Sequence, residues 1–555
     1  MIASTSIIAG ARRSILATAS FLSLLILAAC GGGGGGSDGG SPPPPVGRQA
    51  QTAVFIATEP STQDRHLFSA ADDGTSLTQL TPNFTTTDGT VLIFSVSPDG
   101  RTIAYSAVAT TENVADVYLI PVAGGTPVQV SSGFPDNTRV RSLNWSPDSS
   151  QLAYVANPLG YAPRGFPLYE VFLVDRDGSN DRKINGSIGL PPAVAVADAR
   201  WSPDSRYVAQ GVYSLDPFQV LIGINTHDTS SGVSNSTRVN PSLNWQNGEQ
   251  LSYDWTWSPD STRIAFRSEH RVDNQMELFT VTADGSTLVN IMPLSQGKDI
   301  TRFKWSPNSE RLAYWGDVLD VNKVELFTSR SDGSDHIRLS KNGSLTSGQL
   351  RDIHWLPDSA KLIYSLDQDV SRTWEYFLAD MSSSLHPKIH RDLVAGEAVA
   401  DVSVSPDGRF IAYRSNIESS QAELFVVDAD LSNQRKLSGP IISGGYGVIN
   451  YAWSPDSSRI AYTADRNISP GVLELFVATV DGLTDNQVSP ALPPDEEIVA
   501  PVAADWSKDS TRILFRTIGG NGPFREFRDL WVGKTDGSAP IRLNGTNEEI
   551  AASSY

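Results

Sequence analysis

The sequence predicts an all-β protein built from about ten copies of one four-stranded antiparallel unit. Three observations predict this fold: a Ser-Pro-Asp motif that recurs about every 50 residues, β-rich runs after each motif, and an Asp-Gly turn near the end of many copies. Short strands separated by tight turns at this spacing, with no convincing helix, are typical of β-propeller blades.

The Ser-Pro-Asp motif marks the repeat. Its nine copies end at positions separated by 49, 56, 56, 48, 50, 49, 49 and 53 residues. They lie at residues 97–99, 146–148, 202–204, 258–260, 306–308, 356–358, 405–407, 454–456 and 507–509, with single substitutions in the fifth, sixth and ninth copies. Such regular spacing indicates a repeat architecture rather than several unrelated domains. Because proline fixes the second turn position, each copy is predicted to form a type I turn.

The same elements follow each turn in order. A β-rich run comes first, as in residues 263–266, and a second run such as residues 277–280 follows after a variable loop. An Asp-Gly pair then reverses the chain, as at Asp284-Gly285, and a short last strand completes the unit. Asp-Gly between two apolar runs is a strong hairpin signal.

The two ends of the repeat region are predicted to complete each other. Residues 52–56, 66–69 and 77–80 form an additional unit that lacks an innermost strand, while residues 548–553 remain as an unassigned strand at the other end. We therefore predict that the last strand pairs with the first unit and closes one ring, which removes exposed sheet edges. Two smaller propellers in tandem, or a smaller ring with peripheral units, are the alternatives.

The repeat resembles a known family of propellers. The pattern Trp-Ser-Pro-Asp-(Gly/Ser)-x-x-Ile-Ala-Tyr, followed by Leu-Phe-Val and Asp-Gly, resembles the WD-like repeat of the TolB family over about residues 50–555. It is also similar to the propellers of the dipeptidyl peptidase and tricorn families. This resemblance implies the fold and not a function, because such propellers serve transport scaffolds, peptidases and lyases. The repeat region contains no Gly-x-Ser-x-Gly elbow of a hydrolase, and the α/β domain of TolB is missing, so its partner-binding residues are not carried over.

Residues 1–29 are predicted to be an export signal. Arg12 and Arg13 precede an apolar run that ends at residue 29, which is short for a membrane span of about 20 apolar residues. Residues 27–30, Leu-Ala-Ala-Cys, resemble the lipobox of bacterial lipoproteins, which implies that Cys30 becomes the first residue and is lipidated. A chance cysteine after a plain signal peptide is the alternative. Residues 30–49, rich in glycine, serine and proline, are predicted to be a tether, and residues 50–555 the propeller.

Charge narrows the choice of partners. The chain has 62 acidic and 43 basic side chains, a net charge of −19, and removal of residues 1–29 leaves 41 basic ones and a net charge of −21. We expect no nucleic-acid partner, because a polyanion requires a basic surface. One cysteine excludes internal disulfides. By resemblance to lipoproteins, Gly31 rather than aspartate after the cysteine favours the outer membrane, with the body facing the periplasm or the cell surface.

Two recurrent kinds of side chain are predicted to be structural. Tryptophan precedes the turn in seven copies, Trp145, Trp201, Trp257, Trp305, Trp355, Trp453 and Trp506. Valine replaces it at Val96 and Val404, which indicates core packing. An acid opens the third strand in eight units, at Asp116, Glu170, Glu277, Glu325, Glu375, Glu423, Glu474 and Asp529. We expect these acids to form salt bridges with bases at the end of the preceding strand (Arg267, Arg414 and Arg516), rather than a cation site.

No metal or cofactor is predicted. The hairpin at residues 175–181 is rich in aspartate but lacks the alternation and the terminal glutamate of a calcium loop, so a plain Asp-Gly turn is expected. His386 and His390 would face one metal only on a helix, and their segment is predicted to be loop or strand. No His/Asp/Glu cluster is seen to recur near the inner strands, and no catalytic constellation is predicted.

The candidate binding residues lie in the long connections of one face. These connections contain Tyr161, Arg164, Phe166, Trp245, Tyr253, Phe524 and Arg525. Aromatic residues and arginine are the usual anchors of interfaces, although the connections could also be tolerated insertions. Two functions remain: a non-enzymatic, lipid-anchored scaffold that binds a protein or an envelope polymer, and an enzyme such as a polysaccharide lyase or hydrolase that uses the central funnel. The scaffold is the favoured hypothesis.

Overall fold

The structure is a computed structural model, and it describes most of the repeat region. The described residues are 52–58, 64–84, 89–111, 113–131, 133–161, 167–185, 194–214, 220–231, 236–241, 243, 249–269, 275–295, 297–319, 324–340, 350–366, 374–383, 385–466, 472–492, 496–498, 506–519, 526–544 and 549–554. The predicted signal, the tether and the lipidation site at Cys30 lie outside them. No helix within these ranges is long and apolar enough to cross a membrane.

The described strands form nine antiparallel sheets. Seven have four strands, one has three, and one has eight. The eight-stranded sheet consists of two four-stranded groups that are joined by a single parallel bridge between Arg65 and Thr90. We number the resulting groups of described strands as units 1 to 10, following their second strands along the chain. The predicted all-β architecture of repeated four-stranded antiparallel sheets is confirmed.

Each strand position recurs from unit to unit. The innermost strands are β39 (Glu549–Ser554), β4 (Thr90–Val96), β8 (Val140–Trp145), β12 (Val194–Trp201), β16 (Thr256–Trp257), β20 (Ile300–Trp305), β24 (Leu350–Trp355), β27 (Val399–Val404), β31 (Val448–Trp453) and β35 (Glu496–Ile498). The second strands are β1 (Thr52–Thr58), β5 (Thr102–Val108), β9 (Gln151–Ala156), β13 (Tyr207–Ser214), β17 (Arg263–Ser268), β21 (Arg311–Gly316), β25 (Lys361–Leu366), β28 (Phe410–Ser415), β32 (Arg459–Ala464) and β36 (Arg512–Gly519).

The third strands are about as long as the second, whereas the fourth strands have only two or three residues. The third strands are β2 (Arg65–Ala71), β6 (Asp116–Pro121), β10 (Glu170–Asp175), β14 (Val220–Asp228), β18 (Glu277–Thr282), β22 (Glu325–Arg330), β26 (Glu375–Asp380), β29 (Glu423–Asp428), β33 (Glu474–Thr479) and β37 (Glu526–Lys534). The fourth strands are β3 (Leu77–Gln79), β7 (Val128–Gln129), β11 (Arg182–Lys183), β15 (Thr237–Arg238), β19 (Leu288–Asn290), β23 (Ile337–Arg338), β30 (Arg435–Lys436), β34 (Asp485–Gln487) and β38 (Ile541–Arg542). One single-turn 3-10 helix, η1 (Thr229–Ser231), follows β14.

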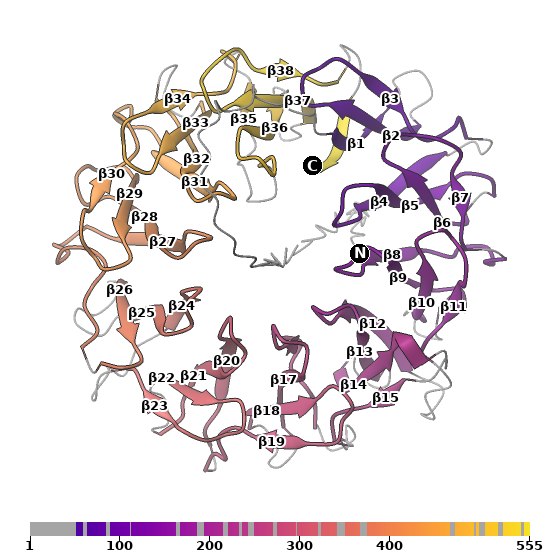
Figure 1. Cartoon of the computed structure of the whole chain (residues 1–555), viewed down its shortest axis with the longest axis horizontal. Helices are drawn as coiled ribbons and strands as arrows, with labels where there is room; N and C mark the ends of the chain where they lie inside the picture. Colours follow the sequence, from indigo (N-terminus) through magenta and orange to yellow (C-terminus); the bar gives the residue numbers. More distant parts are fainter. Residues whose placement is uncertain are drawn as a thin grey trace, which may run out of the picture. The chain divides into compact units, whose positions relative to one another are not determined.

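The sheets of residues 52–554 follow one another around a central opening, and the inner strands lie nearest to it (Figure 1). This arrangement is that of a β-propeller. The hydrophobic core lies between neighbouring units: in one cluster, Ala104 and Val117 of unit 2 pack with Leu143 and Tyr154 of unit 3. Core stability therefore depends on contacts between units as much as on each sheet.

The motif tryptophans join neighbouring units, as their predicted core role requires. Trp145 and Trp257 are buried, and the Trp257 indole N–H donates to the Arg200 carbonyl of unit 4 at 3.2 Å. Trp201, Trp355 and Trp506 donate in the same way to Asn144, Lys304 and Ala452 of the preceding units. Each of these four donating indoles thus fixes the register between two units, whereas the buried Trp305 N–H has no partner among the described residues.

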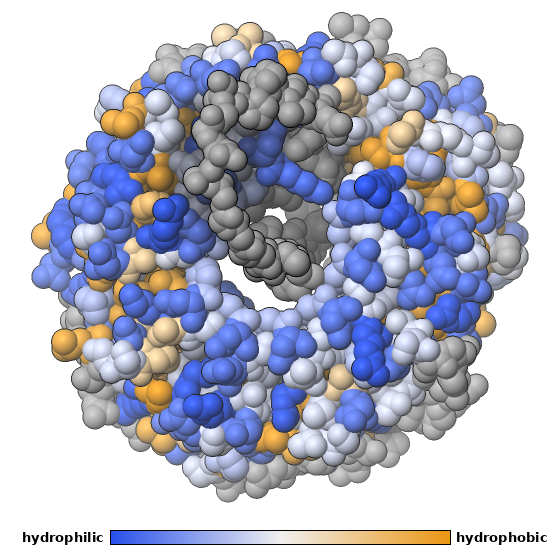
Figure 2. Space-filling view, in the orientation of Figure 1, coloured by the Kyte–Doolittle hydropathy of each residue, from blue (hydrophilic) through white to orange (hydrophobic). Residues whose placement is uncertain are grey.

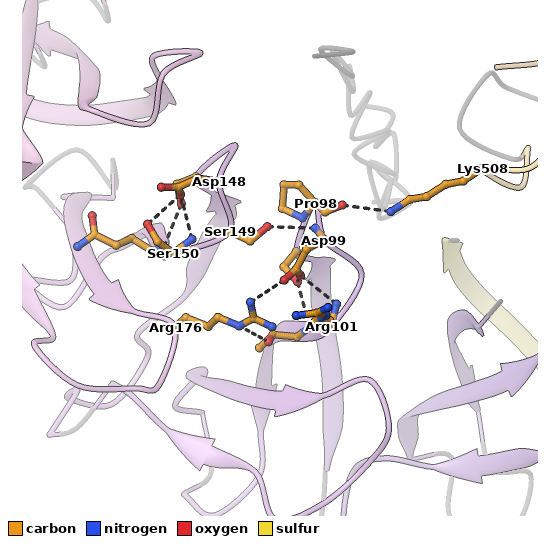
Figure 3. Close-up of polar contacts among 12 residues, drawn as sticks. Pro98, Asp99, Arg101, Asp148, Ser149, Ser150, Arg176 and Lys508 are labelled. Carbon is orange, nitrogen blue, oxygen red and sulfur yellow. Dashed lines mark hydrogen bonds and ion pairs between the residues drawn. The ribbon is translucent and has the colours of Figure 1, made fainter. Parts of the chain in front are cut away.

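The Ser-Pro-Asp turns form a second set of links between units. The Ser149 N–H donates to the Ser146 carbonyl at 2.8 Å, which closes the predicted turn. Ser149 has a positive φ of 64°, and its Oγ accepts the Asp99 N–H of unit 2 at 3.0 Å (Figure 3). The same bond recurs at Ser205, Ser261, Ser309, Ser359, Ser457 and Ser510. A serine with a left-handed backbone is therefore favoured at this position, because its hydroxyl accepts a hydrogen bond from the preceding unit.

Ser261 offers a test of this link. We expect Ser261→Ala to lower the free energy of unfolding by about 1–3 kcal/mol, because it removes the acceptor of the Asp204 N–H and keeps a Cβ at φ 66°. Ser261→Gly should cost about 0.4–1 kcal/mol less than Ser261→Ala, because glycine adopts this φ without strain. Urea unfolding measures both values. Equal losses for the two variants would contradict the role of the left-handed backbone.

The first and last units are in direct contact. β39 pairs with β1 in antiparallel register from Val54–Ser554 to Thr58–Glu549, as the sequence predicts. Phe55 of unit 1 packs in one cluster with Leu530 of unit 10. Lys508 replaces the motif proline in unit 10, and its Nζ donates to the Pro98 carbonyl of unit 2 at 3.3 Å (Figure 3). Because the inner strand of unit 1 is β39, unit 1 has no turn of its own at this point, and Lys508 reaches across it.

Candidate functional site

Strand order decides which face can carry a binding site. Adjacent strands are antiparallel, so the turns after the first and third strands lie on one face, which we call the turn face. The connections after the second and fourth strands lie on the other, the loop face. Both kinds of turn are tight, whereas the connections of the loop face vary in length. The loop face is therefore the face on which this chain can vary its surface.

Two of the seven predicted binding residues lie within the described residues, and both are on the loop face. Tyr161 is 53% exposed and Tyr253 is 55% exposed. The remaining five, Arg164, Phe166, Trp245, Phe524 and Arg525, lie outside the described residues. Three tyrosines are exposed among the described residues: Tyr161, Tyr253 and Tyr446. All three lie on this face.

The structure brings Tyr161 and Tyr253 into one surface, although 92 positions separate them in the sequence. We call this surface the tyrosine–arginine patch, and it consists of Arg141, Tyr161, Tyr169, Arg200, Tyr213 and Tyr253. The Arg141 guanidinium lies over the Tyr169 ring at 5.3 Å, and the rings of Tyr213 and Tyr253 are 5.5 Å apart. Tyr161 is close enough to Tyr169 to interact with it electrostatically, as Arg141 is to Tyr213.

Packing holds the patch in place. Arg200 lies over the buried ring of Trp255 at 4.2 Å, donates to the Trp255 carbonyl, and forms an ion pair with Asp198 at 2.7 Å. Burial, with the neighbouring Tyr253 and Asp198, raises the pKa of Tyr213, so its hydroxyl stays neutral. The patch thus combines phenol rings with the guanidinium group of Arg200, which its contacts hold in place.

Sequence reasoning missed four members of this patch. Arg141 and Arg200 lie on the inner strands β8 and β12, and Tyr213 lies near the end of β13. β13 and β14 continue past a bulge between Val212 and Tyr213, which makes them longer than the corresponding strands of most units. The unusual length of this hairpin is visible in the sequence, but the convergence of three units on one patch is not.

Charged side chains also recur on the inner strands of units 4 to 8. An aspartate stands three residues before the motif Trp or Val at Asp198, Asp254, Asp352 and Asp401. Each is paired: with Arg200 at 2.7 Å, Arg267 at 3.0 Å, His354 at 2.7 Å and Arg414 at 2.6 Å. Figure 2 shows hydrophilic residues around the central opening. These acids recur singly, each in its own ion pair, and sequence reasoning did not single them out.

Five of the eight acids that open the third strands form salt bridges among the described residues, but not with the partners expected. Glu423 lies opposite Ser415, and Arg414 lies opposite Leu424, so Glu423 and Arg414 point to opposite faces of the sheet. Arg414 pairs instead with Asp401, directly opposite on β27. Similarly, Arg267 pairs with Asp254.

The true partners stand 13 residues after each of these acids, four of them on fourth strands and Lys388 at an isolated bridge to Phe377. These pairs are Glu170–Lys183 at 2.7 Å, Glu325–Arg338 at 2.9 Å, Glu375–Lys388 at 2.7 Å, Glu423–Lys436 at 3.1 Å and Asp529–Arg542. Glu474 accepts from the Gln487 amide at 3.0 Å in the same geometry. These acids therefore fasten the outer strands and do not form a ligand site.

The side chains of the two possible metal sites, the histidine pair and the Asp-rich hairpin, are hydrogen-bonded to other groups. His386 contacts the Tyr364 hydroxyl, whereas His390 Nε2 accepts the Tyr376 N–H at 3.1 Å. In the Asp-rich hairpin, Asp177 accepts from Ser179, and Asp181 accepts from the Tyr154 hydroxyl at 2.8 Å. Among the residues placed by the structure, no three His, Cys, Asp or Glu side chains gather as metal ligands.

Comparison with known proteins adds little to this geometry. No protein family and no curated protein matches the sequence. The similar solved structures include a eukaryotic initiation factor (12% identity, TM-score 0.47, 79% of this chain and 96% of that one). They also include an oligogalacturonate lyase in complex with manganese (14%, 0.35, 70% and 97%) and a putative TolB from Agrobacterium tumefaciens (20%, 0.25, 52% and 89%). At these identities and TM-scores, neither function nor site residues are transferred from them.

Proposed function

We propose that this protein is a non-enzymatic, lipid-anchored scaffold of the cell envelope that binds a protein or an envelope polymer through its loop face. The tyrosine–arginine patch carries the proposal. It combines two exposed phenol rings with the exposed Arg141 and with Arg200, which is held by Asp198 and Trp255. Tyrosine and arginine are the residues that most often supply binding energy at interfaces. The anchor would be Cys30, with the body at the outer membrane.

A single ten-bladed ring is the scaffold that we propose. Three contacts between the ends of the repeat region support it: the β39–β1 ladder, the shared cluster around Phe55, and the ion pair between Arg512 and Asp72 at 3.4 Å. Two propellers in tandem would each close within their own half and would leave units 1 and 10 apart. A ring holds the three units of the patch in fixed positions.

Capture from cells tests the binding function. The full-length protein is crosslinked in the envelope, recovered with an antibody, and compared with a variant carrying Tyr161→Ala and Tyr253→Ala. We expect recovery of the partner to fall at least tenfold, because the loss of two aromatic anchors costs about 2 kcal/mol or more. Tyr446→Ala is the matched control, since Tyr446 is 66% exposed on the same face but lies outside the patch.

The outcomes of this capture separate the hypotheses. Recovery of one partner that both variants retain would place binding elsewhere and overturn the role of the patch. Recovery of glycan fragments alone would exclude a protein partner.

The alternative function is an enzyme that acts on a polysaccharide in the central opening. One observation favours it: His354 and Asp352 form a hydrogen-bonded pair at 2.7 Å on the inner strand β24. Such a pair can act as a general base, because the carboxylate stabilises the protonated imidazole. Cleavage of envelope glycans by the wild type, abolished in His354→Gln, would establish the enzyme and displace the scaffold hypothesis.

A further inference from the structure

Unit 6 breaks the charge pattern of the inner strands. Arg302 stands three residues before Trp305, where units 4, 5, 7 and 8 have an aspartate. Arg302 is exposed, and it makes no hydrogen bond or ion pair with the residues that the structure describes. A guanidinium with no partner among the described residues therefore stands where neighbouring units have an internally neutralised pair.

Lys304 adds a second cation on the same side of this strand. It is two residues from Arg302, and alternate residues of a strand point to the same face. The Lys304 Nζ donates to the Ile353 carbonyl of unit 7 at 2.9 Å. The surrounding protein lowers the pKa of Lys304 by desolvation, and the nearby Asp352 offsets part of this effect.

Asp352 interacts electrostatically with Lys304 but is not bonded to it. Asp352 accepts from His354 at 2.7 Å and from the Ile353 N–H at 2.8 Å. It thus has its own partners, while Lys304 bonds a neutral carbonyl. Two cations without a bonded carboxylate among the described residues are unusual in a chain with a net charge of −19.

We propose that Arg302 and Lys304 form a binding site for an anionic oxyacid group, a carboxylate or a phosphate, that enters the central opening. The guanidinium fork fits two oxygens of such a group, and the ammonium supplies a third donor. This site lies in unit 6, whereas the tyrosine–arginine patch is built from residues 141–253 of the preceding units. The proposal therefore does not rest on the function assigned to that patch.

Titration of the full-length protein in detergent tests the site. Inorganic phosphate, succinate and polyphosphate are added separately at low ionic strength, and binding is followed by calorimetry. We expect saturable binding of phosphate or succinate that Arg302→Gln weakens at least tenfold. Arg409→Gln removes the same charge from an exposed ion pair on the turn face and should leave the affinity unchanged. Tighter binding of polyphosphate per site than of phosphate would identify a polymer as the source of the anion.

Several results would overturn the proposal. These are no saturable binding of any of the three probes, equal affinities of the wild type and Arg302→Gln, or equal weakening by Arg409→Gln. Arg302→Gln should fold normally, because the side chain is exposed and bonds no described residue. Lys304→Gln provides a second variant, and retention of full affinity in it would exclude the lysine from the site. Partner capture through the loop face should be unaffected by Arg302→Gln, so failures of the two proposals can be told apart.

Discussion

A chain shortened to end at Asn544 is expected to lose its cooperative fold or to aggregate. The truncation removes β39, which pairs with β1 through five residues from Val54 to Thr58. Residues 53–57 are at most 1% exposed in the complete chain, so the loss would expose apolar side chains of β1 and remove its hydrogen bonds to β39. Each lost hydrogen bond costs about 0.5–1.5 kcal/mol and each newly exposed large apolar side chain about 1.5–3 kcal/mol, so the sum approaches the whole stability of a typical fold of about 5–15 kcal/mol.

The exposed edge of β1 explains why we expect the shortened chain to aggregate. β1 has the sequence Thr-Ala-Val-Phe-Ile-Ala-Thr, which has high β-propensity and no charge. Such an edge is a template for pairing with other chains. Size-exclusion chromatography and urea unfolding of the full and shortened chains measure both effects. Removal of Tyr555 alone, beyond the last paired residue, is the control. A shortened chain that stays monomeric with unchanged stability would contradict closure through β39.

The fold could be predicted because its signals are local and repeated. The Pro-Asp turn and the Asp-Gly hairpin form from neighbouring residues, and the buried tryptophan recurs at the same place in seven units, so each copy in the sequence predicts the same structure. Lys508 is the exception, because its contact with Pro98 requires the two ends of the repeat region to lie together.

The side-chain pairings could not be predicted, because they depend on register. The fourth strands have only two or three residues, too few to show an alternation, so the partners of the third-strand acids were assigned to the wrong strand. On the inner strands, a bulge such as the one between Val399 and Asp401 shifts the pairing with the second strand. Simple alternation therefore does not indicate which side chain faces the opening.

The pair Glu325–Arg338 should show the strongest effect of a single side chain. Glu325 is 1% exposed, and its carboxylate accepts from Arg338 at 2.9 Å and from the Leu319 N–H at 2.6 Å. We expect Arg338→Leu to lower the free energy of unfolding by about 3–5 kcal/mol, because it leaves a buried carboxylate without its cation. Urea unfolding of the purified protein measures the loss.

Replacing both members distinguishes an unpaired charge from lost packing. Glu325→Leu combined with Arg338→Leu should regain most of the stability, because two apolar side chains at this site leave no charge to desolvate. Arg206→Leu is the control: its ion pair with Asp228 at 2.9 Å is solvent-exposed and should be worth about 1 kcal/mol or less. If Arg338→Leu lowered the free energy of unfolding no more than Arg206→Leu, the ion pair with Glu325 would contribute no more than a surface ion pair. The backbone alone would then keep the acid buried. A double variant as unstable as Arg338→Leu would instead show that the arginine stem, and not its charge, holds the outer strand.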